Sequence, residues 1–483
     1  MLNSLIKNIS DDFKALSSGV LLVEDNNRFL FRADVTSALK EEGILISHGT
    51  SLKQRVDFEL RDDKYLLVLL SDQRKNYLED IERAAVRYEF FLDKYLNSYH
   101  IPAIINEDLN TLDALFKRNP VISLSKQETL AEIRSARSDN DRNTFDIDSF
   151  KRSLAIDPDL STVDWNKIMK VISNGLITTI GTDQYNSVID EINRVNDIFQ
   201  QHLKSNYAQL KKSNPVKSPK IVSKILDYID FNFSNDKIAL IVIDGLSLWQ
   251  YRMFNDKLNG KKQENIIYAW LPSITQLSRQ AIFRGKKPER SYRQNPDNED
   301  KLWKQYWKDK GFNEFEIKYE HDSTDIENLI SVKRLALVFN DLDDYMHSSK
   351  DYTDLLKLTE NWIDRSGIVA IIDKLLQEDF KVFITSDHGN IHAKGWRKLK
   401  GREKLGTNKS GSRSERHIEY SEKWLKDELL ISNPELKDSV IQDKHAIYFK
   451  TDSSFSSKKS LVTHGGSHIL EVLVPFIVIK NEA

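Results

Sequence analysis

Short, uninterrupted apolar runs recur in the C-terminal half of the chain, and three of them are followed by an acidic residue. The three runs are Lys237–Ile243, Leu335–Phe339 and Lys381–Thr385, and the acidic residues are Asp244, Asp343 and Asp387. Runs without polar alternation are typical of strands buried on both faces, as in a parallel sheet covered by helices. Because ligands of open α/β sheets bind beyond the carboxyl ends of the strands, the sequence predicts a site at that edge. A further run, Val472–Ile479, is a predicted strand near the end of the sequence.

The N-terminal part of the chain has the same character on a smaller scale. Apolar runs at Gly19–Val23, Gly43–Ser47 and Tyr65–Leu70 predict three strands, and Ala33–Glu42 is a predicted helix. Strands of this kind separated by helices indicate a parallel sheet. We therefore expect a small α/β domain over residues 1–75.

The middle of the chain has few strand signals. Residues 76–210 form a predicted helical region that begins with the helical periodicity of Leu78–Leu96, and the polar interval Arg134–Asp148 is predicted to be a surface loop. Residues 211–220 contain two prolines and four lysines and are predicted to be a linker. Residues 221–483 then form the predicted domain that contains the acidic strand ends.

Composition excludes several kinds of site. The 483-residue sequence has no cysteine, which excludes disulfides, cysteine nucleophiles, iron–sulfur clusters and thiolate zinc sites. Its 71 basic and 73 acidic residues leave a formal charge of −2, so contact with nucleic acid would need a local basic patch. No signal peptide is recognisable, and no apolar run reaches the roughly 20 residues of a transmembrane helix. We expect a soluble cytoplasmic protein without a membrane partner.

Carboxylates and imidazoles are the remaining ligand types for a divalent metal in a chain without cysteine. The candidates are Asp244, Asp343, His347, Asp387, His388 and His464. Each motif alone is also compatible with a turn or a solvated helix face, and it is their joint order after buried strands that indicates a site. Three aspartates and three histidines could hold two ions, the arrangement used for phosphoryl transfer. Hydroxyls for a nucleophile follow the first aspartate at Ser273 and Thr275.

The order of these motifs resembles the alkaline phosphatase superfamily, and most closely its PglZ branch, which is found in phage-defence systems of the BREX type. The matching segments are Ile243–Gly245, Pro272–Thr275, Ser278–Arg279, Phe283–Gly285, Asp343 with His347, Thr385–Gly389, Thr463–Gly466 and Val474–Pro475. The resemblance covers residues 237–480, half of the chain. It implies an α/β fold in which an alkaline-phosphatase-like core sheet is flanked by helices, in a PglZ catalytic domain over residues 221–483.

The resemblance also implies a role for each candidate. One metal ion would be held by Asp343, His347 and His464, and the other by Asp244, Asp387, His388 and the hydroxyl of Thr275. The two divalent ions would be zinc, with manganese or magnesium as alternatives. Thr275 would be the nucleophile, with Ser273 as the competing candidate. Asp341 and Asp344 lack the family's spacing to the histidine and are predicted to be solvated or capping.

Basic residues near these motifs are candidates for substrate binding, and we assign this role to Arg279, Lys394 and Arg397. The last two open a basic segment, Lys394–Arg416, which contains nine basic residues and two acidic ones. A basic segment beside a phosphoryl-transfer site would attract polyanions such as nucleic acid. The alternative interpretation is a flexible, solvated loop.

Three functions remain open at this point. The first is a divalent-metal-dependent phosphodiesterase acting on nucleotides or nucleic acid in an anti-phage defence system. The second is a phosphomonoesterase or protein phosphatase of the same fold. The third is a non-catalytic scaffold that binds other defence-system proteins, although a scaffold would have no need for the complete ligand set.

Overall fold

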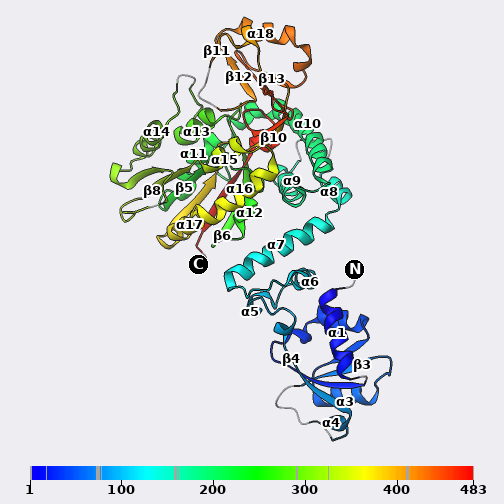
Figure 1. The fold of residues 1–483 in the computed structure, drawn as a ribbon. Helices are drawn as coiled ribbons and strands as arrows, with labels where there is room; N and C mark the ends of the chain where they lie inside the picture. Colours follow the sequence, from blue (N-terminus) through cyan, green and yellow to red (C-terminus); the bar gives the residue numbers. More distant parts are fainter. Residues whose placement is uncertain are drawn as a thin grey trace. The chain divides into compact units, whose positions relative to one another are not determined.

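The computed structural model describes residues 3–17, 19–71, 77, 79–156, 160, 163–289, 292–324, 326–408 and 413–481. Contacts divide the chain into two compact units, Met1–Phe145 and Asp146–Ala483 (Figure 1). The division falls inside the predicted helical region, so that region contributes helices to both units. Among the described residues, no helix is both long enough and apolar enough to cross a bilayer.

The first unit is built around a four-stranded parallel sheet in the order β2-β3-β1-β4. The strands predicted in the N-terminal part are confirmed as β1, β2 and β3, and the predicted helix is confirmed as α2. The elements of this unit are α1 (Ser4–Leu16), β1 (Val20–Asp25), η1 (Phe29–Phe31), α2 (Ala33–Glu41), β2 (Ile44–Ser47), α3 (Ser51–Glu59), β3 (Leu66–Ser71), α4 (Glu79–Ala84), β4 (Ala85–Phe90), η2 (Leu92–Lys94), α5 (Ile101–Ile104), α6 (Leu109–Arg118) and α7 (Lys126–Thr144).

Two predictions for the middle of the chain are wrong. The predicted helix Leu78–Leu96 contains strand β4, which pairs with β1 from Val20↔Ala85 to Asp25↔Phe90. Backbone pairing with a strand some sixty residues away outweighs the local helical pattern here, because β1 would otherwise leave one edge unpaired. The predicted loop Arg134–Asp148 is mostly helix, since α7 begins with a capping box at Ser125 and continues to Thr144.

The second unit contains a six-stranded sheet in the order β6-β17-β9-β5-β8-β7. Strands β9, β5, β8 and β7 are parallel, while β17 runs antiparallel to β9 and β6. All four apolar runs of the C-terminal half are confirmed as strands of this sheet. The strands are β5 (Lys237–Ile243), β6 (Lys261–Tyr268), β7 (Ile317–His321), β8 (Arg334–Phe339), β9 (Phe380–Thr385) and β17 (Leu473–Lys480).

Helices flank this sheet, as Figure 1 shows, in agreement with the predicted α/β class. Several of them start directly after a strand and so hold the residues that follow the strand ends. The helices of the second unit are α8 (Ile147–Ser153), α9 (Trp165–Thr179), α10 (Tyr185–Leu210), η3 (Val222–Lys224), α11 (Ile225–Phe233), α12 (Leu248–Asn255), α13 (Thr275–Arg284), α14 (Pro296–Asp309), η4 (Glu314–Glu316), α15 (Asp341–Ser348), α16 (Tyr352–Arg365), α17 (Ile368–Gln377), η5 (Gly401–Lys404), α18 (Lys423–Ser432), η6 (Pro434–Leu436) and α19 (Ile469–Val472).

Two smaller sheets accompany the main one. One is a three-stranded sheet in the order β15-β10-β16, whose strand β16 is followed in the chain by α19 and β17. A four-stranded sheet in the order β11-β12-β14-β13 packs with α18 and forms a small lobe, residues 401–408 and 413–449, coloured orange in Figure 1. The strands are β10 (Ile391–Gly395), β11 (Thr407–Asn408), β12 (His417–Tyr420), β13 (Val440–Gln442), β14 (Ala446–Phe449), β15 (Ser453–Ser454) and β16 (Ser460–Thr463).

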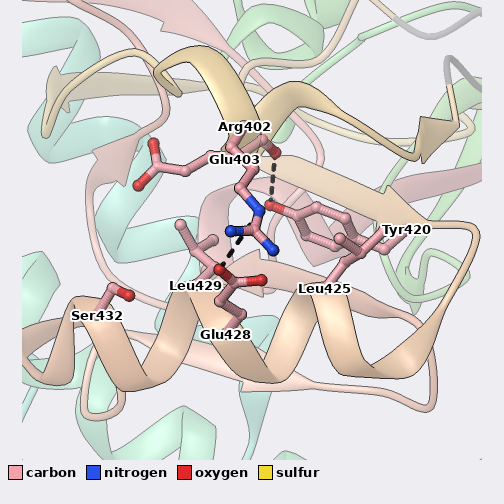
Figure 2. Close-up of a pocket in the computed structure, with 7 residues that line it drawn as sticks. All are labelled: Arg402, Glu403, Tyr420, Leu425, Glu428, Leu429 and Ser432. Atoms are coloured by element: carbon pink, nitrogen blue, oxygen red, sulfur yellow. Dashed lines mark hydrogen bonds and ion pairs between the residues drawn. The ribbon is translucent and has the colours of Figure 1, made fainter.

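A cavity in the small lobe lies between η5 and α18 (Figure 2). Its volume is about 50 Å³, far below the few hundred Å³ of a typical ligand pocket. The Tyr420 hydroxyl donates to the Glu403 carbonyl across it, and Arg402 lies 3.7 Å from Glu428. These contacts close the lobe around its own core, so the cavity is not a candidate substrate site.

The turn before α19 contains a buried histidine that should make the second unit sensitive to acid. His468 Nδ1 accepts from the Leu470 backbone N–H at 3.3 Å, and Nε2 contacts Asn193 Oδ1 at 3.2 Å. Burial, together with the charge of Arg416, lowers the pKa of His468 to about 3. The unfolded chain binds this proton near the ordinary pKa of about 6.5, so stability is lost as pH falls below that value.

We expect His468→Asn to reduce this acid sensitivity, because asparagine can accept the same backbone N–H but does not titrate. The wild type should lose up to about 1.4 kcal/mol per pH unit more than the variant below pH 6. Thermal unfolding followed by circular dichroism at pH 7, 6 and 5 measures the difference. His48→Asn, in the other unit, is the control. If the stability of wild type and of His468→Asn changed equally with pH, His468 would not be the source of the acid sensitivity.

Candidate active site

The residues that follow β5, β8 and β9 meet at one edge of the main sheet, because parallel neighbouring strands end on the same side. Asp244 follows β5, and Asp387 with His388 follows β9. Helix α15 begins directly after β8 and carries Asp343 and His347 one turn apart. His464 comes from a different place, the segment directly after β16. The structure therefore brings all six predicted acidic and imidazole ligands to one region.

The first group of converging side chains is Asp343, His347 and His464. Asp343 Oδ1 lies 3.4 Å from His347 Nε2 and 3.8 Å from His464 Nε2. One ligand atom from each of the three residues lies within 4.8 Å of the others. One carboxylate oxygen and two imidazole nitrogens at this spacing are a donor set suited to zinc or a related divalent ion.

The second group is centred on His388. Its Nε2 lies 3.4 Å from Asp244 Oδ1, 3.6 Å from Asp387 Oδ2 and 3.0 Å from Thr275 Oγ1. Ligand atoms of Asp244, Asp343 and His388 lie within 4.8 Å of one another. Asp343 is thus shared by both clusters, whereas Asp387 belongs to neither and contacts His388.

Four ligand atoms in these groups are buried without a hydrogen-bond partner. They are Asp244 Oδ1, Asp343 Oδ1, His347 Nε2 and Asp387 Oδ2. A buried polar atom left unpaired costs about 1–3 kcal/mol, and more when it is charged, so a cluster of them requires an explanation. Divalent cations supply one, because each orphaned atom can donate an electron pair to a metal ion. The residues present therefore fit the metal ions that the sequence implies.

Backbone carbonyls orient the two central imidazoles. His464 Nδ1 lies 2.9 Å from the Ser273 carbonyl oxygen, and His388 Nδ1 lies 2.9 Å from that of Gly389. Because a carbonyl only accepts, each Nδ1 donates, and the lone pair of each Nε2 is directed at the carboxylates. The two rings stack in parallel at 3.8 Å between centroids. Burial and the neighbouring His388 lower the pKa of His464, which keeps its ring neutral.

Crowding of carboxylates dominates the electrostatics of the site. Burial and the nearby charges of Asp387 and Asp343 raise the pKa of Asp244. Burial also opposes ionisation of Asp343, but contact with His347 outweighs it and lowers the pKa of Asp343. Negative charge at this density is what a pair of divalent cations would neutralise.

The two candidate nucleophiles have different surroundings. Thr275 is the first residue of α13, half-buried, with its hydroxyl on His388 Nε2. Ser273 is fully buried, and its hydroxyl donates to the Gly466 carbonyl at 3.0 Å while accepting from the Gly465 N–H at 3.2 Å. Only the threonine hydroxyl therefore contacts the ligand groups directly.

The three predicted substrate-binding residues lie in different places. Arg279 reaches the ligands, but its buried guanidinium is bound to Glu299 and Asp244. Lys394 Nζ pairs with Asp452 at 2.9 Å, and Arg397 pairs with Glu403 at 2.7 Å. Among the described contacts, these two side chains engage Asp452 and Glu403 and not the metal-ligand candidates.

The remaining aspartates near α15 are engaged elsewhere. Asp341 accepts from the Trp362 indole N–H at 3.0 Å, and Asp344 pairs with Arg413 at 2.7 Å. Neither belongs to the clusters of potential ligand atoms found among the described residues.

Sequence reasoning did not single out Arg413, one of the nine basic residues of the segment Lys394–Arg416. Its guanidinium lies 3.2 Å from Asp343 Oδ2, and the side chain is 58 % exposed. The next residue, Ser414, donates to the His464 carbonyl at 2.6 Å, which fixes the segment beside the ligands. The charge pattern indicated a basic segment near the site, but only the contact with Asp343 selects this arginine.

A family comparison agrees with this geometry. The chain matches the family model described as the BREX system PglZ alkaline phosphatase-like domain over residues 222–479, which is more than half of its length. The protein therefore has an alkaline-phosphatase-like α/β domain of the phosphoester hydrolase class. It belongs to the PglZ family, as the motif order implied. No curated protein matches the chain in sequence.

Solved structures with a similar fold each cover 51 % of the chain. Ectonucleotide pyrophosphatase/phosphodiesterase 5 matches over 88 % of its own chain, at 11 % identity and a TM-score of 0.34 for the mouse protein and at 12 % and 0.35 for the human one. Phosphonoacetate hydrolase from Sinorhizobium meliloti 1021, solved in complex with phosphonoformate, matches over 91 % of its chain at 11 % identity and a TM-score of 0.36.

We expect Asp387→Ala and His388→Ala to lower metal content by about one ion per chain, because each removes a donor from the second group. The fold should survive in both variants, since the main sheet does not depend on these side chains. Elemental analysis after dialysis against metal-free buffer measures the content, and circular dichroism checks the fold.

Asp344→Ala is the matched control, because it removes an aspartate next to the site that contacts only Arg413 among the described partners. It should retain the wild-type metal content. Full metal content in both Asp387→Ala and His388→Ala would show that the second group is not a metal site.

Proposed function

We propose that the protein is a divalent-metal-dependent phosphodiesterase that acts on nucleotide or nucleic-acid phosphodiesters in a BREX-type phage-defence system. The observation that carries the proposal is the convergence of two groups of carboxylate and imidazole atoms, several of them unpartnered, one of which contacts the hydroxyl of Thr275 through His388. Membership of the PglZ family supports phosphoester hydrolysis in a defence setting. Metal identity, substrate class and partner proteins are part of the proposal.

Each side chain has a role under this proposal. Asp343, His347 and His464 would hold one divalent ion, and Asp244, Asp387, His388 and Thr275 the other. When bound, the ions supply positive charge that favours ionisation of the nucleophile and stabilises negative charge on the phosphoryl oxygens. Thr275 Oγ1 is the group assigned to attack phosphorus, losing its proton as the new P–O bond forms and the alcohol leaves. Water then hydrolyses the phosphothreonine and restores the enzyme.

Charge balance favours a diester over a monoester. Arg279 with Glu299 and Arg413 with Asp344 form ion pairs without net charge, which leaves the negative charges of Asp244, Asp343 and Asp387. Two divalent cations would then leave the site with one net positive charge. A phosphodiester carries a single negative charge, whereas a fully ionised monoester carries two, so the site is better matched to the diester.

The proposal is tested by assaying the purified full chain with zinc or manganese against bis-p-nitrophenyl phosphate and p-nitrophenyl phosphate. We expect faster turnover of the diester, and loss of turnover when a chelator removes the metal. Preference for the monoester would instead indicate a phosphatase of the same fold. Bound metal without turnover of either substrate would support the non-catalytic scaffold.

The nucleophile can be identified by substitution. Thr275→Ala should reduce kcat for the aryl diester by about 10²-fold or more, because it removes the hydroxyl that contacts His388 Nε2. Thr275→Ser should retain measurable activity, since it keeps a hydroxyl at the same position. Ser273→Ala is the matched control and should be mild, because its hydroxyl contacts backbone groups. An inactive Ser273→Ala beside an active Thr275→Ala would reverse the assignment.

The basic segment provides the test for nucleic-acid binding. Lys398, Lys400 and Lys404 are exposed, in contrast to the paired Lys394 and Arg397. We expect glutamine at all three positions to weaken oligonucleotide binding. The slope of log binding constant against log salt concentration should become less steep by up to about two, because fewer counterions are released. Turnover of the aryl diester should stay nearly unchanged.

The control for this charge change is a second triple variant, Lys301→Gln and Lys308→Gln on α14 and Lys310→Gln directly after it. It removes the same number of exposed charges from the same unit. If the two triple variants bind oligonucleotides equally, the basic segment has no particular role in binding nucleic acid.

A further inference from the structure

Arg279 is among the most deeply buried charged residues of the described chain. Its side chain is 2 % exposed and that of its partner Glu299 is fully buried. The contact is bidentate, with Nε donating to Glu299 Oε1 at 2.9 Å and Nη2 donating to Oε2 at 2.7 Å. Burying such a pair gives little or no net stability, so its presence beside the ligand clusters points to a task other than holding the fold together.

The third nitrogen of the guanidinium connects three parts of the site. Arg279 Nη1 donates to Asp244 Oδ2 and to Asn340 Oδ1, both at 3.2 Å. Asn340 is the residue before α15, the helix that carries Asp343 and His347. Arg279 itself lies on α13 one turn after Thr275, so both side chains extend from the same face of that helix.

The contact with Asp244 selects which carboxylate oxygen is available. Oδ2 is occupied by Arg279, while Oδ1 has no hydrogen-bond partner and lies 3.4 Å from His388 Nε2. Without the arginine, the carboxylate could rotate and present either oxygen. The guanidinium therefore fixes the orientation of this candidate ligand.

Glu299 is held in turn by residues from other elements. The Tyr319 hydroxyl, on β7, donates to Glu299 Oε2 at 2.6 Å, and the Gln294 amide donates to Oε1. Glu299 belongs to α14. The guanidinium is thus clamped from α14 and β7 on one side and reaches β5 and α15 on the other.

We infer that Arg279 is a positioning residue that holds Asp244, the start of α15 and the helix of Thr275 in register, and that it does not contact substrate. Each of its nitrogens already has a protein partner, so none is directed at a bound phosphate. This role replaces the substrate contact predicted for Arg279 from the sequence. It rests on the proposed function for its catalytic consequence, but its effect on metal binding can be measured without catalysis.

The experiment compares wild type with Arg279→Gln, Arg279→Lys and Tyr319→Phe. Zinc affinity is measured by competition with a chromogenic chelator, alongside kcat and KM for bis-p-nitrophenyl phosphate and inhibition by inorganic phosphate. We expect Arg279→Gln to weaken zinc binding and lower kcat by about 10- to 100-fold, while KM and phosphate inhibition change by less than about threefold. Arg279→Lys should not restore either property, because a lysine cannot form the two-pronged contact.

Arg284→Gln is the matched control, because this arginine lies on the same helix but pairs with Glu289 near the surface. It should behave as wild type. Tyr319→Phe removes one hydroxyl without removing a charge, and it should change zinc affinity and kcat in the same direction as Arg279→Gln but less. It keeps the inference testable if Arg279→Gln does not fold.

Two results would overturn the inference. Unchanged zinc affinity in a folded Arg279→Gln, or in Tyr319→Phe where Arg279→Gln does not fold, would show that the network does not position the ligands. Weaker phosphate inhibition and a raised KM with normal zinc affinity would restore a substrate contact. If the wild type hydrolyses nothing, the proposed function fails, yet the zinc measurements still decide the role of Arg279.

Discussion

Three carboxylates buried at one sheet edge are the constraint on which the rest of the site depends. Asp244, Asp343 and Asp387 are all fully or nearly fully buried, and mutual repulsion adds to the cost of burial, as the raised pKa of Asp244 shows. Such a concentration of negative charge is stable only with compensating groups around it. The two arginines at Asp244 and Asp343 and the fit to divalent cations answer this requirement.

The histidines complete the set of potential metal ligands through their orientation. Their Nδ1 atoms are occupied by the carbonyls of Ser273 and Gly389, so the unprotonated Nε2 atoms face the carboxylates. Close backbone packing makes this possible. Gly465 has a φ of +105°, and a Cβ there would overlap the Ser414 hydroxyl that contacts the His464 carbonyl. A glycine is therefore required next to His464 for the segment that carries Arg413 to approach the site.

The two arginines differ in a way that bears on function. Arg279 is buried and saturated with protein partners, whereas Arg413 is largely exposed at the same ligand cluster. A buried arginine with a full set of partners sets geometry, while an exposed one remains accessible to solvent and solutes. The family membership and the ligand clusters define the general chemistry of the domain. The two arginines bear on which substrate it accepts and on how its ligand side chains are oriented.

The sequence alone determined the class of fold, four of the six strands of the main sheet and the six acidic and imidazole ligand candidates. These features can be read from sequence because a strand buried on both faces needs a continuous apolar run. Metal binding in turn needs acidic or imidazole side chains, and several of these follow such runs. The local sequence pattern predicted a helix where the structure has strand β4, because pairing with β1 outweighs helical periodicity there. It also could not separate Arg279 from Arg413, or Ser273 from Thr275, because neighbouring residues of the same type differ only in what they contact. Those contacts come from segments far apart in the chain, such as Ser414 on His464 and Glu299 on Arg279, so only the tertiary structure decided them.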